Sequence, residues 1–304
     1  LNFIFKIKNK ELNFENIKFL LKNKNLNIPI LKAEKKNSGF FITGKLKKKN
    51  LSFKKNEIKK FTNNKIINTN LNNITFVVDS NFNFFIYKNF KFKELEISSI
   101  NDIKKIKINN FLEKKNFLNK IKNNIIFEDQ KININYSKSK IEINGSGNIF
   151  IQDNPDIISY KVVNKKDNYF FDLELNIIDN PVVVDLINFE KKKQTSLNFK
   201  TKGVLKKNNW EFDEIILLEN ENILSIKNLK LTNDYRIEDI ENIKFYFEDK
   251  SKQKNDLELI KNSSNYSIIG NSFNADKLIT ELLSSKKDSK RKVFSKNFDF
   301  RIDI

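Results

Sequence analysis

The stretch NYFFDLELNII, residues 168–178, decides the fold class of this chain. Apolar and polar side chains alternate along it. The apolar positions are Tyr169, Phe171, Leu173, Leu175 and Ile177, and the polar ones between them are Asp172, Glu174 and Asn176. A period of two is that of a β-strand, whose successive side chains point to opposite faces of the sheet. The stretch therefore predicts a strand with one apolar face and one polar face.

The same alternation continues outward along most of the chain. In KININYSKSKIEING, residues 131–145, it places Ile132 and Ile134 before a polar SKSK link and Ile141 and Ile143 after it, which predicts a hairpin. Roughly twenty such segments follow one another, separated by short polar turns. This pattern predicts a mainly β protein built as a long antiparallel meander. An apolar sheet face must be covered, and alternation alone is compatible with a closed core, two stacked layers or an open trough.

Two short helices are expected to interrupt the strands. In IDNPVVVDLINFEKK, Asn180 suits an N-cap and Pro181 the first helical position, followed by an apolar stripe. In IIGNSFNADKLITELLSS, residues 268–285, Asn274 suits the cap, Phe273 is placed to pack on the first turn, and the stripe consists of Leu278, Ile279, Leu282 and Leu283. A third helix is expected between Asn110 and Lys122.

The composition weakens most enzyme hypotheses. The 304 residues include no histidine and no cysteine, which removes the commonest general base, the thiol nucleophiles and the commonest zinc ligands. No phosphate-binding loop or nucleophile elbow is present, and NGSGN at residues 144–148 is expected to be a hairpin turn. We therefore expect no enzyme activity, no cofactor and no metal.

The net charge of +19 would suit a nucleic-acid partner, but the kind of basic residue argues against it. Of the 57 basic residues only Arg236, Arg291 and Arg301 are arginine, whereas base and phosphate recognition favour the guanidinium group. The lysines alternate with apolar residues along the chain, as on a solvated sheet face. A solvated lysine face is therefore the leading interpretation, with nucleic acid and an anionic membrane surface as the alternatives.

No apolar run approaches the roughly 20 residues of a transmembrane helix. The chain opens with LNFIFKI, without a start methionine, and closes with FDFRIDI, which resembles an unfinished strand. We expect residues 1–304 to be one continuous β-rich segment of a larger protein, whose membrane anchor would lie outside this segment. Within it, residues 1–129 form the N-terminal part, which precedes residues 130–304.

Residues 130–304 carry a resemblance to a known family. The motifs are IDNPVVVDLINFEKK, then TSLNFKTKGVL with its lone Gly203, then NNWEFDEIILLENENILSIKNLKL, and finally YSIIGNSFNADKLITELLSS. Together they resemble the AsmA-like superfamily, and more closely its YhdP-type branch of large bacterial envelope proteins. Asn274 stands where the family pattern has an aspartate, a change that keeps the capping role.

The resemblance implies a long sheet curled into an open, elongated groove with an apolar interior. It also implies a periplasmic location within an inner-membrane-anchored protein, and carriage of phospholipid toward the outer membrane without catalysis. The candidate groove residues on this basis are Ile132, Ile134, Ile141, Ile143, Phe171, Leu173, Leu175, Ile177, Leu197, Phe199, Leu278, Ile279, Leu282 and Leu283. The alternative is a structural or adhesive envelope protein with a closed β-core and no ligand.

Overall fold

The computed structural model describes residues 2–8, 11–21, 24–53, 70–71, 74–89, 91–109, 124–137, 140–192, 194–207, 209–263, 265–277, 279–280 and 300–303. Strands dominate these residues. Nineteen of the strands belong to one sheet, and β12 and β13 form a separate pair. The predicted mainly β fold and its antiparallel meander are confirmed. The chain divides into two compact units.

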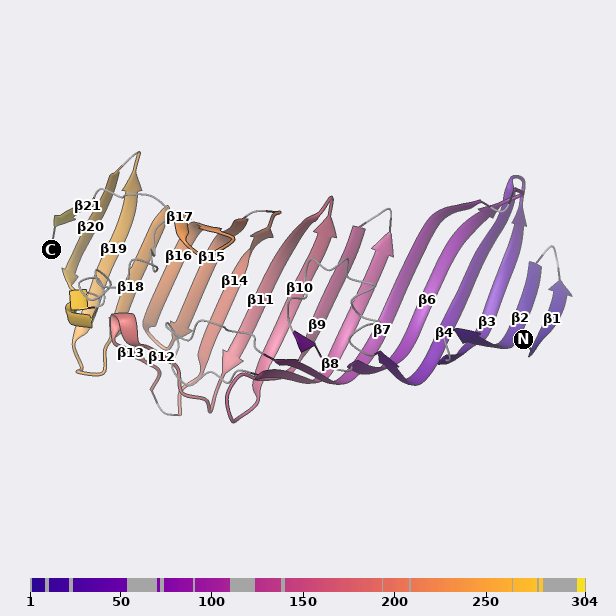
Figure 1. The fold of residues 1–304 in the computed structure, drawn as a ribbon, viewed down its shortest axis with the longest axis horizontal. Coiled ribbons are helices and arrows are strands. Elements are labelled where there is room, and N and C mark those ends of the chain that lie inside the picture. Colours follow the sequence, from indigo (N-terminus) through magenta and orange to yellow (C-terminus); the bar gives the residue numbers. More distant parts are fainter. Residues whose placement is uncertain are drawn as a thin grey trace. The chain divides into compact units, whose positions relative to one another are not determined.

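The first unit comprises residues 1–111, 124–149 and 161–166. Its pairs are antiparallel and follow chain order from β1 to β4, then β6 to β8, with the short β5 pairing to β7. Figure 1 shows these strands side by side in that order. The strands are β1 (Asn2–Lys8), β2 (Glu11–Leu21), β3 (Lys24–Lys36), β4 (Gly39–Phe53), β5 (Asn70–Leu71), β6 (Ile74–Tyr87), β7 (Phe92–Asn109), β8 (Asn124–Ser137) and β9 (Lys140–Phe150). Strand β8 ends at Ser137 and β9 begins at Lys140, and residues 138–139 of the predicted hairpin link lie outside the described residues.

The second unit comprises residues 112–123, 150–160 and 167–304. Its strands pair in chain order, with β11 joined directly to β14 and β16 joined to both β17 and β18, and among the described pairs only the last, β20 with β21, is parallel. The strands of its sheet are β11 (Asn168–Ile177), β14 (Leu197–Leu205), β15 (Asn209–Glu219), β16 (Asn222–Thr232), β17 (Ile237–Asp239), β18 (Asn242–Glu248), β19 (Lys254–Asn262), β20 (Asn265–Ser272) and β21 (Phe300–Asp303). Strand β10 (Asp156–Lys165) contributes residues to both units.

The α-helix expected after Asn180 is absent, and that prediction is wrong. The segment instead forms β12 (Val183–Val184), a three-residue 3-10 helix η1 (Asp185–Ile187) and β13 (Phe189–Glu190). Three consecutive β-branched valines disfavour the α-helix because their side chains lose rotamer freedom against the preceding turn. The Asn180 side chain donates to the Asn154 carbonyl at 2.7 Å and to Asp156 at 2.8 Å, so it does not cap a helix.

A helical turn does follow Asn274. Residues 276–277 and 279–280 are helical, and the Ile279 N–H donates to the Ala275 carbonyl at 2.8 Å. The Asn274 side chain accepts a long, 3.4 Å bond from the Asp276 N–H, and Phe273 stacks on Phe245 at 6.2 Å. Leu278, Leu282 and Leu283 lie outside the described residues, as does the third expected helix.

The NGSGN turn is also wrong, because residues 144–148 lie inside β9. Glycines in these sheets serve close approach between strands. At Gly203, a Cβ atom would lie 2.2 Å from the Glu211 carbonyl oxygen and 3.0 Å from the Phe171 ring. The described positions with left-handed backbone are instead held by residues such as Asn16, Asn220 and Asn228, and by no glycine.

Candidate functional site

One face of the second unit's sheet is almost entirely apolar. Residues that oppose one another across an antiparallel pair point to the same side, so the strand register assigns each side chain to a face. This apolar face consists of Tyr169, Phe171, Leu173, Leu175, Ile177, Leu197, Phe199, Thr201, Gly203, Leu205, Trp210, Phe212, Ile215, Leu217, Leu224, Ile226, Leu229, Leu231, Ile243, Phe245, Phe247, Leu257, Leu259 and Ile268. Thr201 is the polar member within this set, and Glu219, Asn222, Asn255 and Lys261 lie on the same side near the strand ends. The face crosses β11 and the strands from β14 to β20, and Ile237 of the short β17 joins it opposite Leu231.

The opposite face of the same strands is charged. Lys200 lies 3.2 Å from Glu174 and Lys202 lies 4.0 Å from Glu214, in each case across a strand pair. The pKa of Glu174 is lowered because Asn198 and then Lys200 donate hydrogen bonds to its carboxylate. This pattern accounts for part of the lysine-rich composition. In this unit such lysines lie on a solvated strand face, where carboxylates on neighbouring strands balance their charge.

Most residues of the apolar face are only half-buried. In the described part of this unit, strands contact chiefly their hydrogen-bonded neighbours, and the two-stranded β12–β13 pair packs on the apolar face at one rim without covering the rest. A core residue enclosed by two layers would be buried on every side. The apolar face therefore keeps a substantial surface that water or another apolar molecule must cover.

One rim of this face is closed by residues 178–196, which contain β12, η1 and β13 and are called the cap below. Phe189 of the cap and Leu197 of β14 are completely buried, and Phe189 packs edge-on against Phe247 at 5.5 Å. Figure 1 shows β12 and β13 beside the ends of β16 and β18. The cap buries the apolar face where these strands end or begin.

Two buried carboxylates hold the cap in place. The completely buried Glu219 accepts hydrogen bonds from the Lys192 N–H at 2.6 Å, from the Thr195 hydroxyl and from the Asn222 amide at 3.1 Å. Asp249 accepts from the Asn188 amide at 3.1 Å and from the Asn274 amide at 2.9 Å. Polar bonds thus join the cap to the sheet on both sides of its apolar contact.

The opposite rim carries a cluster of four aromatic rings, Phe171, Trp210, Phe212 and Tyr235, which we call the aromatic rim. Ring centroids lie 5.6 Å apart for Phe171 and Phe212, 6.2 Å for Trp210 and Phe212, and 6.4 Å for Trp210 and Tyr235. Tyr235 is 66% exposed and has left-handed backbone, φ 60°. Sequence reasoning identified the strand that begins at Trp210 but missed this cluster, because Tyr235 lies in the turn after β16.

The first unit has a comparable apolar face with a polar interruption. In β7, Ile97 and Ile103 share a face with Ser99 and Asn101 between them. Ser80 and Ser99 oppose each other and share a 2.7 Å hydrogen bond, and both are buried. The neighbouring Gln130 is 1% exposed and donates to the Asn148 carbonyl at 2.8 Å. These buried polar residues were not predicted, although polar residues at alternate positions in ISSIND, residues 97–102, were a visible signal.

The candidate groove residues fall on these faces as follows. Ile132 and Ile134 lie on the first unit's interrupted face, opposite Asn101 and Ser99. Ile141 and Ile143 alternate in β9 with the ion-paired Glu142, so they point away from it. The second unit's apolar face brings together Phe171, Leu173, Leu175, Ile177, Leu197 and Phe199. Ile279 is 51% exposed in the helical turn. The face also contains Phe212, Ile215, Leu217 and the β16–β20 residues, which the sequence did not single out.

Perturbed titratable groups are scattered over both units. Hydrogen bonds from Lys140, Lys161 and Asn144 lower the pKa of Glu142 to about 2. Burial raises the pKa of Asp156, and burial raises the pKa of Tyr160 to about 12. Within the described ranges, no group of three or more potential metal ligands is found. Nor does any helix there have the length and apolar character required to cross a membrane.

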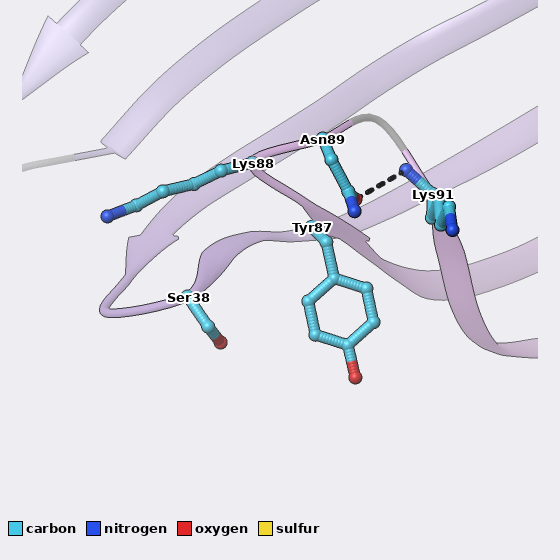
Figure 2. Close-up of a pocket in the computed structure, with 5 residues that line it drawn as sticks. All are labelled: Ser38, Tyr87, Lys88, Asn89 and Lys91. Carbon is cyan, nitrogen blue, oxygen red and sulfur yellow. Dashed lines mark hydrogen bonds between the residues drawn. The ribbon is translucent and has the colours of Figure 1, made fainter.

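A shallow depression of about 390 Å³ lies between the β3–β4 and β6–β7 turns and is lined by Ser38, Tyr87, Lys88, Asn89 and Lys91. The Lys91 N–H donates to the Asn89 side chain at 3.2 Å, which shapes the turn. Figure 2 shows the Lys88 side chain extending away from the Tyr87 ring. We assign the candidate site to the apolar face of the second unit instead.

Comparison of the chain with protein-family models, with characterised proteins and with solved structures finds no match.

Proposed function

We propose that this chain binds the acyl chains of phospholipids on its apolar face and passes lipid along it without catalysis. In this proposal the sheet is curled into an open groove, the lipid headgroups stay in water, and the chain is the periplasmic part of an inner-membrane-anchored protein that moves phospholipid between the inner and outer membranes. The resemblance to YhdP-type envelope proteins supplies the location. The half-buried apolar face of the second unit is the observation that carries the proposal.

The apolar face is incompletely buried, which gives an acyl chain a reason to bind there. Each methylene group that leaves water contributes about 0.8 kcal/mol, on the protein as on the lipid. The apolar face of β14, β15 and β16 is nearly continuous, since most of its apolar residues oppose another apolar residue across a strand pair, as Leu217 opposes Phe199 and Leu224. Apolar contacts of this kind favour no single position of the acyl chain along the face. A bound acyl chain can therefore slide without breaking directional bonds, which suits transport better than storage.

Two adjacent residues of β15 provide a matched test. Ile215 lies on the apolar face, opposite Thr201 and Ile226, whereas Ile216 lies on the charged face, opposite Lys200 and Ser225. Both are half-buried isoleucines in the same strand. We expect Ile215→Asp to lose most co-purifying phospholipid in native mass spectrometry and most transfer of fluorescent phospholipid between vesicles, because a carboxylate on the face repels acyl chains. Ile216→Asp should retain both.

Circular dichroism and urea unfolding of both variants control for folding. Equal losses in two folded variants would contradict the proposal. A wild-type protein that carries no lipid and accepts none from vesicles would favour the alternative, a structural or adhesive envelope protein.

A further inference from the structure

We infer that the aromatic rim docks against the headgroup region of an anionic lipid bilayer. This interaction surface goes beyond the proposed lipid path, since a protein can dock on a bilayer without transferring lipid. It rests on the chemistry of the rim, on the geometry of one turn and on the contrast between the two rims of the same face.

The rings of the rim have the chemistry of a membrane interface. Tryptophan and tyrosine combine an apolar ring with one polar group, and they concentrate at the level of lipid headgroups. Trp210 and Tyr235 lie 6.4 Å apart, and Phe171 and Phe212 extend the same cluster into the apolar face. The rim thus joins a surface suited to headgroups to a surface suited to acyl chains.

The turn that carries Tyr235 holds its ring outward. The Tyr235 N–H donates to the Thr232 carbonyl at 2.9 Å, and the Thr232 N–H donates to the Arg236 carbonyl at 3.0 Å. The Arg236 N–H also donates to the Thr232 hydroxyl at 3.1 Å. A left-handed backbone is costly for a bulky residue, yet the turn keeps Tyr235 there with its side chain 66% exposed. An exposed ring fixed in a rigid turn loses little conformational freedom when it inserts into an interface.

The two rims of the apolar face differ in what covers them. At the opposite rim, the cap leaves Phe189 and Leu197 with no exposed surface. At the aromatic rim, Trp210 and Phe212 are half-buried and Tyr235 is exposed, with no cap over them among the described residues. Of the two, only the aromatic rim offers acyl chains a path between the face and a bilayer.

Charge favours an anionic bilayer over a neutral one. At the aromatic rim, Lys206 pairs with Glu211 at 2.6 Å and Arg236 pairs with Asp234 at 2.6 Å, and Lys207 is exposed beside them. The chain as a whole carries +19. A positive protein is drawn to the negative surface potential of an anionic bilayer, and a lysine at its surface adds to the attraction.

Trp210 is the single tryptophan of the chain, so its fluorescence reports on this rim alone. With the 304-residue chain and vesicles of phosphatidylcholine and phosphatidylglycerol, we expect the emission to shift to shorter wavelength. Lipids brominated near the headgroup should quench it more than lipids brominated at the chain ends. Co-sedimentation gives the affinity. Tyr235→Ser and Lys207→Gln should each weaken binding about five-fold.

Tyr246→Ser is the matched control, because Tyr246 is 44% exposed on the charged face of the same unit. It should bind like the wild type. The proposal is overturned if anionic vesicles neither shift the emission nor sediment the protein. Equal weakening by Tyr235→Ser and Tyr246→Ser would overturn it as well. Ile215→Asp separates the two proposals: docking should persist in this variant when bound lipid is lost.

Discussion

At the scale of single residues, the fold depends on a few buried polar groups that the alternation of apolar and polar residues does not predict. Glu219 ends β15, at a position where the strand pattern expects an apolar or solvated residue. It is completely buried and accepts hydrogen bonds from Lys192, Thr195 and Asn222. Asn255 is similarly buried and accepts from the Asn274 N–H at 2.8 Å. Such residues fix the position of irregular segments, whose own backbones form few ladder hydrogen bonds.

Glu219→Ala should therefore destabilise the protein. The substitution leaves buried donors without an acceptor, and we expect the free energy of unfolding to fall by about 2–4 kcal/mol. Urea unfolding followed by Trp210 fluorescence measures the change. The exposed Glu221, two residues along, provides the control, since Glu221→Ala should change the free energy by less than about 0.5 kcal/mol. A Glu219→Ala variant as stable as Glu221→Ala would show that the cap is not held through this carboxylate.

At the scale of secondary-structure elements, the cap is attached to the sheet by apolar packing and by charge. Burial works to raise the pKa of Asp249, but hydrogen bonds from Asn274, from the Gln253 N–H, from Asn188 and from the Ser251 N–H outweigh it, so the pKa lies below its usual value. A carboxyl whose folded pKa is depressed stabilises the fold above the unfolded pKa, and that stabilisation disappears as the pH falls through the folded pKa.

Acid should therefore loosen the cap before it unfolds the strands. As the pH falls below the ordinary aspartate range and through the depressed pKa of Asp249, the protonated carboxyl loses acceptor strength toward Asn188 and Asn274. We expect amide exchange of residues 182–190 to accelerate relative to that of β15 and β16, once both are corrected for the intrinsic effect of pH. In Asp249→Asn, which has no carboxylate at this position, cap exchange should already be fast at neutral pH and should change little on acidification. A cap whose protection follows that of β15 at every pH would refute this coupling.

Sequence reasoning succeeded for the elements with strict alternation and failed where tertiary contacts decide. The apolar face of residues 169–177 follows from a period of two, and so do the strands that end at Ser137 and begin at Lys140. The helix expected after Pro181 depended on capping residues, but the valines that follow favour extended backbone, and the contact of Phe189 with Phe247 joins residues 58 positions apart. The candidate groove residues of β11 and β14 share a face because each strand alternates. The aromatic rim could not be predicted, since it requires a turn to fold back on a strand.

At the scale of the whole molecule, an apolar face that is half-buried has consequences in solution. Monomeric soluble proteins rarely expose apolar patches larger than a few hundred Å². Delipidated protein should therefore bind an apolar dye such as anilinonaphthalene sulfonate, and it should self-associate at lower concentration than the lipid-loaded form. Light scattering coupled to size-exclusion chromatography measures the association, and added phospholipid should displace the dye. Ile215→Asp should reduce dye binding, whereas Ile216→Asp should not. Monomeric, dye-free apo protein would show that the face is already covered.

Because most strands pair with the strands next to them in the chain, the length of the sheet can change without disturbing the remaining strand pairs. In the second unit, β15 and β16 leave one rim and return to it while keeping their apolar residues on the same side. Removing or duplicating such a hairpin returns the chain to the same rim with the same face outward, whereas a single strand would reverse its direction. With strands about 4.8 Å apart, the surface can thus grow or shrink in steps of about 10 Å without redesign of the remaining pairs. A chain built in this way can be fitted during evolution to the distance it must span, one hairpin at a time.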